Sequence, residues 1–202
     1  MKDKLKEAIQ TYNKIANLYA EYTETKIMQY QISKFTSVLP GKKVLDAGCG
    51  VGRDVAYMEE DGLDITGIDI SEGILKEAKK RYPKSKFKLM DFRKMSFKAK
   101  SFDGIWSMAG LIHTDRNEMP KILKEFNRIL KQNGIIYLAV VEGEGEEEVR
   151  KQKYENEPRT YVYYKLPEIE KFLGEAGFQI MHSEISQTDT KNWVEVFARK
   201  IN

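Results

Sequence analysis

A glycine-rich turn between an apolar run and a helical pattern is the part of this chain best suited to hold a small molecule. The segment 44–54 contains a short apolar run, the carboxylate Asp46, and Gly48, Gly50 and Gly52 on alternate positions. Glycines at such a turn allow φ > 0, and they let a ligand approach where a Cβ atom would clash. The pattern is typical of a loop that holds a nucleoside cofactor.

The neighbours of these glycines indicate which cofactor the loop holds. A dinucleotide fingerprint, G-x-G-x-x-G, that starts at Gly48 needs glycine at position 53, where this chain has Arg53. A carboxylate at Asp46, directly before the turn, repels a pyrophosphate. S-adenosylmethionine has no phosphate, and its methionine end carries an ammonium and a sulfonium that a carboxylate attracts. The loop therefore favours S-adenosylmethionine over NAD.

Two other residues of the turn each have two interpretations. Arg53 pairs either with the carboxylate of the cofactor, through a charge-assisted bond, or with Asp54 or Glu21. Cys49 is either a nucleophile or a small residue that the cofactor loop accommodates, and we favour the second interpretation. Because Cys49 is the one cysteine in the sequence, an internal disulfide and a multi-cysteine zinc site are excluded.

Carboxylates also follow the next two apolar runs. Asp69, with Ile70 beside it, ends the second run roughly 20 residues after the glycines, where an acid accepts hydrogen bonds from ribose hydroxyls. Asp91 follows the third run, where its carboxylate can accept a hydrogen bond from the exocyclic amine of adenine while Phe92 flanks the ring. Three strand ends are thus predicted to carry three acids that face one cofactor.

Five segments, in order, resemble the successive motifs of class I S-adenosylmethionine-dependent methyltransferases: VLDAGCGVG, ITGIDIS, KLMDF, FDGIWSMAGLIHT and RILKQNGIIYLAV. The resemblance spans about residues 40 to 141. It implies that the first motif cradles the methionine moiety, that Asp69 holds the ribose and that Asp91 meets the adenine. The cofactor implied by the family is S-adenosyl-L-methionine.

The segment 107–113 resembles the fourth-strand loop of small-molecule methyltransferases. The resemblance implies that the backbone at Ser107 and Met108 lies near the sulfonium of the cofactor. Enzymes of this fold that methylate nucleobase amines have Asp or Asn, then Pro-Pro and an aromatic residue here, and the Ser-Met-Ala-Gly of this chain argues against such acceptors. His113 has two interpretations. It is either a general base for an acceptor that must lose a proton, or a structural residue that caps the next helix or bridges the loop.

Near the start of the chain, Tyr12, Ala16 and Tyr19 follow the pattern Y-x-x-x-A-x-x-Y, which resembles the helical lids of the family. Such lids close over the methionine and the acceptor. Tyr19 is therefore a candidate contact of the cofactor, whereas core packing is the simpler interpretation of Tyr12. We expect residues 1 to about 30 to be mobile without ligand and ordered with it.

Apolar spacing predicts the elements that position these residues. We expect two helices within 3–39, followed by strands at 43–47, 64–69, 86–90, 102–107 and 134–141. Between the strands we expect helices at 52–61, 71–82 and 115–131, the last two with Ser71 and Asp115 as N-caps. A closing helix at 167–176 and strands at 178–180 and 193–198 follow. Alternation of strands and helices indicates an α/β fold with a parallel sheet. The resemblance implies a Rossmann-like, doubly wound, seven-stranded, mainly parallel sheet with an antiparallel last strand and an N-terminal helical lid.

The length of 202 residues suits one α/β domain, and the resemblance implies that this is a single methyltransferase domain over 1–202. We divide it into a helical lid at 1–40, a cofactor-binding core at 41–141, an insertion at 142–165, and a C-terminal helix and strand pair at 166–202. The insertion combines a run of glutamates with a tyrosine-rich stretch. The glutamates lack the spacing of a known calcium loop, so we expect no metal.

Composition bounds the location and the partners. Charged residues make up 32% and hydrophobic residues 41% of the chain, and no apolar run approaches the roughly 18 residues of a membrane span. Since the first residues lack the apolar core of a signal peptide, we expect a cytoplasmic protein without a membrane partner, as a monomer or homodimer. The net charge of +3, from 34 basic and 31 acidic residues, does not favour a nucleic-acid binder.

The sequence therefore predicts a methyltransferase (EC 2.1.1.-) that acts on a small-molecule acceptor. Two alternatives stay open: a methyltransferase of tRNA or protein, which a basic strip beside the pocket would favour, and a non-catalytic cofactor-binding partner. An NAD-dependent oxidoreductase has the same general fold, but Asp46 and Arg53 argue against it.

Overall fold

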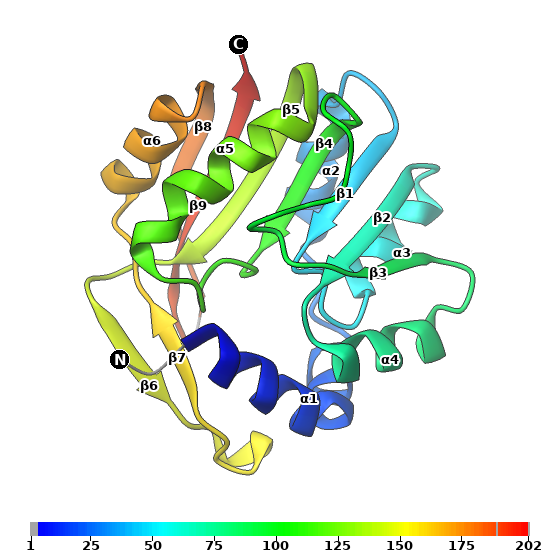
Figure 1. Cartoon of the computed structure of the whole chain (residues 1–202), viewed down its shortest axis with the longest axis vertical. Coiled ribbons are helices and arrows are strands. Elements are labelled where there is room, and N and C mark those ends of the chain that lie inside the picture. Colours follow the sequence, from blue (N-terminus) through cyan, green and yellow to red (C-terminus); the bar gives the residue numbers. More distant parts are fainter. Residues whose placement is uncertain (1–3, 189, 202) are drawn as a thin grey trace.

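The computed structural model describes residues 4–188 and 190–201. A sheet of seven strands forms its centre, in the order β3-β2-β1-β4-β5-β9-β8 (Figure 1). The strands are β1 (Lys43–Ala47), β2 (Asp64–Asp69), β3 (Lys86–Leu89), β4 (Phe102–Met108), β5 (Leu130–Val141), β8 (Phe178–Gln187) and β9 (Asn192–Lys200). Strands β1 to β5 are parallel, and β9 is inserted antiparallel between β5 and β8. The predicted fold class is confirmed.

Helices cover both faces of this sheet. One face packs against α5 (Met119–Ile129) and α6 (Leu166–Glu175), and the other packs against α2 (Gln29–Val38) and α3 (Arg53–Glu60). Apolar residues at helical spacing supply both contacts, because each helix buries one stripe of side chains and leaves the opposite face to solvent. Among the described residues, no helix has the length and apolar character needed to cross a bilayer.

The helix α4 (Glu72–Arg81) follows β2 and begins at Ser71, as predicted. The Ser71 hydroxyl accepts a hydrogen bond from the Ile74 amide at 3.2 Å. The predicted cap at Asp115 is wrong: its side chain makes no capping bond, and a short 3-10 turn (Arg116–Glu118) precedes α5. Asp115 instead accepts a hydrogen bond from Lys4 at 2.7 Å, because the first helix lies within its reach.

The insertion after β5 folds into a hairpin that the sequence did not predict. It consists of β6 (Glu146–Val149), a 3-10 turn (Gln152–Tyr154) and β7 (Arg159–Val162), with β6 and β7 paired antiparallel in a separate two-stranded sheet. The closing strand β8 is also longer than the three residues predicted at 178–180, because polar residues that alternate along it obscure the apolar pattern.

The first helix, α1 (Lys4–Thr23), crosses the carboxyl edge of the sheet, between α4 and the hairpin (Figure 1). On one side, Oδ1 of Asn13 accepts hydrogen bonds from the Ser71 hydroxyl and the Gly73 amide, both at 2.8 Å. On the other side, the Thr11 hydroxyl donates to the carbonyl of Pro158 at 2.7 Å. The segment predicted as a lid therefore encloses the edge where β1, β2 and β4 end.

Candidate functional site

Two adjoining cavities lie at this carboxyl edge beneath α1, and the β6–β7 hairpin lines the smaller one. Their volumes are about 260 and 500 Å³. Residues that line both include Tyr19, Gly48, Gly50, Met108 and Trp193. In open α/β sheets, ligands bind outside the carboxyl ends of the strands, so this position is the expected one for a functional site.

The glycine turn forms the wall between the two cavities. Gly48 and Gly50 have φ values of 84° and 54°, in the left-handed region that favours glycine. A Cβ atom on Gly48 would lie 2.7 Å from the Cα atom of Gly110, so no larger residue fits there. A Cβ atom on Gly50 would meet only Tyr19, at 3.6 Å, and would occupy cavity space. The turn thus keeps backbone exposed to a ligand.

The carboxylate of Asp69 is fixed at the end of β2, in the wall of the smaller cavity. Its Oδ2 atom accepts a hydrogen bond from the Gly50 amide at 3.0 Å, and its Oδ1 atom accepts one from the Ser71 amide at 2.9 Å. Burial raises the pKa of Asp69, while these backbone donors act in the opposite direction. Each oxygen keeps a second lone pair with which to accept a hydrogen bond from a ligand hydroxyl.

Asp46 is a buried carboxylate that lines the larger cavity. Burial is the main cause that raises its pKa well above the usual value, the charge of Asp54 adds to this effect, and Arg53 opposes it. No hydrogen bond joins its side chain to another residue in the described part of the chain. A buried charge needs a partner, so a cation in this cavity would stabilise the ionised form of Asp46. The site therefore suits the ammonium group of S-adenosylmethionine.

Arg53 also lines the larger cavity, and its guanidinium is held by the protein. Its Nε atom donates to Oδ1 of Asp54 at 2.7 Å, and its Nη1 atom donates to the Thr23 carbonyl at 3.1 Å. Trp106 donates to the other oxygen of Asp54 at 3.1 Å. Of the two ion-pair partners that the sequence suggested, Asp54 is the one that Arg53 contacts.

His113 lies after β4 and joins the loop to the hairpin. Its Nδ1 atom lies 2.7 Å from the Thr160 carbonyl, and its Nε2 atom lies 3.0 Å from the Tyr12 hydroxyl. Because a carbonyl oxygen can only accept, Nδ1 carries the proton and Nε2 accepts from Tyr12. Burial, with a smaller contribution from the nearby Arg159, lowers the pKa of His113 to about 4, while the hydrogen bond to the Thr160 carbonyl acts in the opposite direction. The ring is therefore neutral at pH 7, and it bridges the loop, one of the interpretations that the sequence left open.

Most of the predicted site residues line one or both cavities. They are Tyr19, Asp46, Gly48, Cys49, Gly50, Arg53, Asp69, Ile70, Phe92, Met108 and His113. Tyr19 packs edge-on against Tyr12, with 5.2 Å between the ring centroids. Residues from the lid, from the glycine turn and from the ends of β2 and β4 are thus brought together.

Three predicted site residues do not line either cavity. Asp91 forms an ion pair with Arg93, with 2.7 Å between Oδ2 and Nη2. Ser107 is fully buried, and its hydroxyl donates to the Ala47 carbonyl at 3.1 Å. Gly52 precedes α3 as its N-cap, at φ 80°. The side chains of Asp91 and Ser107 are thus used within the protein, and Gly52 shapes the start of the helix.

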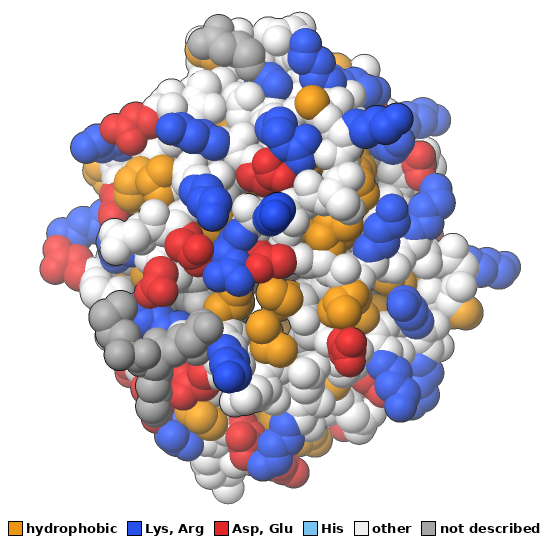
Figure 2. Space-filling model, viewed as in Figure 1, with side chains coloured by type: hydrophobic (Ala, Val, Ile, Leu, Met, Phe, Trp, Pro, Cys, Tyr) orange, Lys and Arg blue, Asp and Glu red, His pale blue; other side chains and the backbone are white. Residues whose placement is uncertain are grey.

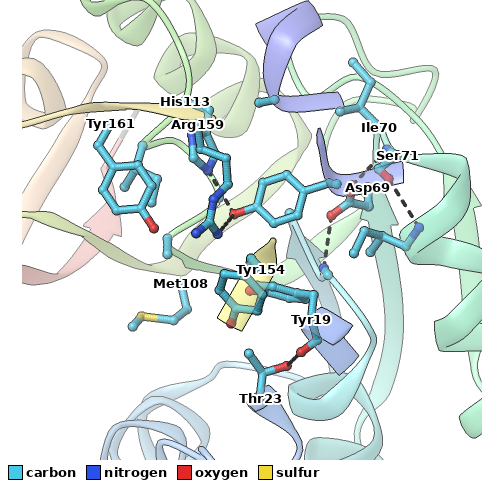
Figure 3. A pocket seen from close by; sticks show the side chains of 18 of the residues that line it. Tyr19, Thr23, Asp69, Ile70, Ser71, Met108, His113, Tyr154, Arg159 and Tyr161 are labelled. Carbon is cyan, nitrogen blue, oxygen red and sulfur yellow. Dashed lines mark hydrogen bonds between the residues drawn. The ribbon is translucent and has the colours of Figure 1, made fainter. Parts of the chain in front are cut away.

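The hairpin contributes a wall of the smaller cavity that was not predicted from the sequence. Arg159 and Tyr161 lie on the same side of β7, and they line the smaller cavity together with Tyr154 (Figure 3). In Figure 3, Arg159 and Tyr161 lie on the side of the cavity that also holds His113, opposite Asp69. A period of two along 159–161 is the signal that could have found them, since alternate residues of a strand share a face.

Comparison with known proteins gives a consistent assignment. Residues 45–138 match the family described as methyltransferase domain. The methyltransferase GfsG of Streptomyces halstedii is 30% identical over 120 residues, which is 55% of this chain and 42% of that protein. The chain thus spans less than half the length of the curated relatives that it matches.

Solved structures share the fold over most of the chain. A methyltransferase from Methanosarcina mazei has a TM-score of 0.75 at 22% identity, with 82% of this chain and 96% of that chain covered. The 1,6-didemethyltoxoflavin-N1-methyltransferase of Burkholderia thailandensis has a TM-score of 0.76 at 21% identity, with 100% of this chain and 92% of that chain covered. Residues 45–138 thus match a methyltransferase domain, and the chain as a whole shares the fold of solved methyltransferases.

Proposed function

We propose that this protein transfers a methyl group from S-adenosylmethionine to a small-molecule acceptor. One observation carries the proposal: the cavity of about 260 Å³, which Phe92 also lines, has Asp69 and Ile70 on one side and His113 and Tyr161 on the other. The first side has the groups that suit a nucleoside. The second side carries side chains that a nucleoside does not need, and these would contact the acceptor.

The residues that would hold the cofactor follow from their chemistry. Asp69 would accept hydrogen bonds from the ribose hydroxyls, while Ile70 and Phe92 would pack against the adenine. Asp46 would attract the ammonium group. When bound, S-adenosylmethionine supplies an electrophilic methyl group on its sulfonium. The predicted contact of Asp91 with the adenine amine stays a prediction, because Arg93 holds that carboxylate in the absence of ligand.

The lid and the hairpin would enclose the acceptor and exclude water from the transfer. The hydrogen bonds of Asn13 to α4 and of Thr11 to Pro158 hold α1 over the cavity from both sides. Methyl transfer is an in-line displacement, so alignment of the two reactants supplies much of the rate enhancement. Enclosure of this kind favours a compact acceptor over a tRNA or a protein.

The role of His113 in this proposal is to position Tyr12. Both ring nitrogens already make hydrogen bonds, and an imidazolium would stand beside the positive charge of Arg159. A proton from the acceptor is therefore poorly stabilised on this ring. Direct catalysis by His113 stays a prediction, and the transfer as proposed relies on proximity rather than on a base.

The relatives support a small acceptor. The structure of the Burkholderia enzyme is described with bound 1,6-didemethyltoxoflavin and S-adenosylhomocysteine, and it aligns with the whole of this chain. The surface gives less support to a nucleic-acid acceptor. Figure 2 shows Lys and Arg spread over one face as separate side chains with Asp and Glu among them, not as an unbroken basic strip.

The proposal is tested by following a labelled methyl group. The protein is incubated with methyl-labelled S-adenosylmethionine and, separately, with a small-metabolite extract, total tRNA and total protein. We expect label in the small-metabolite fraction alone, and none with Asp69→Asn, whereas Asp64→Asn at the exposed start of β2 should label normally. Label in tRNA or protein would contradict the small-molecule acceptor, and no label in any fraction would favour a non-catalytic partner.

A further inference from the structure

The lining of the smaller cavity carries a concentration of positive charge. Five basic residues line this cavity: Lys26, Lys151, Lys153, Arg159 and Lys191. Asp69 is the one carboxylate among the described residues that line it, and its oxygens already accept two backbone hydrogen bonds. The cavity therefore has an excess of positive charge, and Arg159 lies on the side opposite Asp69 (Figure 3).

Arg159 is the buried centre of this group, with 1% of its surface exposed. Its Nη1 atom donates a long hydrogen bond, 3.5 Å, to the Tyr12 hydroxyl. Its Nε and Nη2 atoms are buried and have no hydrogen-bond partner in the described part of the chain. Buried guanidinium groups are normally paired with an acid, and an unpaired one is costly. Two N–H positions of this guanidinium, at Nε and Nη2, are thus available to a ligand with hydrogen-bond acceptors.

The free atoms form one edge of the guanidinium. The N–H groups of Nε and Nη2 point in the same direction, and this parallel pair matches the two oxygens of a carboxylate or a phosphate. Tyrosine rings hold the guanidinium in place, with 4.6 Å from its central carbon to the ring centroid of Tyr154 and 5.9 Å to that of Tyr161. The free edge therefore belongs to a rigid group, which is the arrangement of a binding site.

The lysines that line the same cavity add to the positive charge of Arg159. Lys191 lies over the ring of Tyr161, 4.3 Å from the centroid. Burial lowers the pKa of Lys151, and the positive charges of Arg159, Lys191 and Lys26 lower it further. Mutual repulsion of this kind is relieved when an anion binds among the cations.

We propose that the methyl acceptor carries an acid group, a carboxylate or a phosphate, and that Arg159 binds this group through its Nε–Nη2 edge. The inference rests on the proposed function and names the class of its acceptor. We distinguish this acid group from the carboxylate of the cofactor, because Arg159 lies opposite Asp69 (Figure 3). Arg53, by contrast, lines the larger cavity together with the glycine turn.

Three probes with the same ring test the inference: benzoate, phenyl phosphate and the neutral benzamide. Calorimetry measures their binding to the protein saturated with S-adenosylhomocysteine. We expect at least one acid to bind about tenfold or more tightly than benzamide, the factor that a bidentate charged pair typically supplies. Benzoate above phenyl phosphate indicates a carboxylate acceptor, and the reverse order indicates a phosphate acceptor.

Variants identify the residue responsible. Arg159→Gln should remove the preference for acids and leave the affinity for S-adenosylhomocysteine within about twofold. If this variant does not fold, Arg159→Lys keeps the charge without the fork, and it should lose several-fold of the preference. Arg150→Gln is the matched control, since Arg150 is exposed, pairs with Glu148 and does not line the cavity.

The inference is overturned by any of three results: equal binding of benzamide and the acids, no binding of either acid at millimolar concentration, or an acid preference that Arg159→Gln leaves unchanged. A larger loss of S-adenosylhomocysteine affinity than of acid preference in Arg159→Gln would assign Arg159 to the cofactor instead. Failure of the proposed function is seen separately, because S-adenosylhomocysteine would then not bind. The acid preference of the ligand-free protein would still test Arg159.

Discussion

The hydroxyl of Tyr12 lies 3.0 Å from Nε2 of His113, so the first helix and the loop after β4 share a hydrogen bond inside the cavity. Because the Tyr12 pKa is raised well above its usual value, mainly by burial, the tyrosine keeps its proton and donates it to the ring. This bond stabilises the neutral form of His113. The lid and the site are thus coupled through one titratable residue.

The first prediction concerns the protonation of His113. Its pKa of about 4 in the folded protein lies below the value of about 6.5 in an unfolded chain. The neutral ring therefore contributes stability that is fully present above pH 6.5 and is lost as the pH falls through 4. We expect the wild type to lose about 2 to 3 kcal/mol more of its free energy of unfolding over this range than His113→Gln.

Urea unfolding at a series of pH values measures this difference. The sequence has two histidines, so a proton NMR titration of the wild type and of His182→Gln identifies the His113 signal directly. Parallel pH profiles for wild type and His113→Gln, or an NMR midpoint near 6.5, would show that His113 is not held neutral in the cavity.

The second prediction concerns Asp46. Its raised pKa is expected to fall when the ammonium of the cofactor binds, because the cation favours the ionised carboxylate. The affinity for S-adenosylhomocysteine should therefore increase as the pH rises through the pKa of ligand-free Asp46, with proton release on binding. Asp46→Asn should remove this dependence and weaken binding by roughly 1.5 to 3 kcal/mol.

Calorimetry in buffers of different ionisation enthalpy measures the released protons. Asp64→Asn serves as the control, because Asp64 is an exposed carboxylate that pairs with Lys86, away from both cavities. Proton release that persists unchanged in Asp46→Asn would assign the effect to another group.

The third prediction compares two glycines that need the same backbone conformation. Gly50 and Gly62 have φ values of 54° and 80°, and a Cβ atom on Gly62 would meet nothing within 4 Å. Alanine should cost about 1 kcal/mol of folding stability at either position, because both are left-handed. Only Gly50→Ala should also lower the affinity for S-adenosylhomocysteine, since only Gly50 lines the cavities. Equal affinities of the two variants for S-adenosylhomocysteine would show that the glycine turn does not contact the cofactor.

The fourth prediction concerns the lid. The carbonyl oxygen of the Asn13 side chain holds α1 to the start of α4 through two hydrogen bonds, whereas Asn17 on the same helix bonds only to the exposed Glu21. Asn13→Ala should therefore increase hydrogen exchange of the amides from 8 to 22, and Asn17→Ala should leave it unchanged. S-adenosylhomocysteine should slow exchange in the wild type. Strong, equal protection with and without ligand would mean that α1 is fixed packing.

The cofactor half of the site could be predicted from the sequence because its signals are local. The glycine turn and the acids Asp46 and Asp69 follow directly after short apolar runs, so their places at strand ends are set by residues next to them in the chain. Asp91 was predicted by the same reasoning, but Arg93, two residues later, holds its carboxylate away from the cavity. The apolar pattern of a strand does not reveal that a nearby arginine will pair with the carboxylate at the end of the strand.

Of the acceptor half, His113 was predicted, but the wall formed by the hairpin was not, because it depends on pairing between short polar segments. The strands β6 and β7 have four residues each, and β6 is mostly glutamate, so no apolar alternation marks them. Arg159 and His113 meet only because the loop after β4 bonds to the Thr160 carbonyl across 47 residues of sequence. Contacts between distant segments of this kind are set by the folded structure rather than by local pattern.

The central claim is that the cavities beneath α1 hold S-adenosylmethionine, and calorimetric titration of the wild type with S-adenosylhomocysteine and with NAD tests it most directly. We expect one-to-one binding of S-adenosylhomocysteine and no measurable heat with NAD, because an ionised Asp46 attracts an ammonium and repels a pyrophosphate. Binding of NAD without binding of S-adenosylhomocysteine would contradict it.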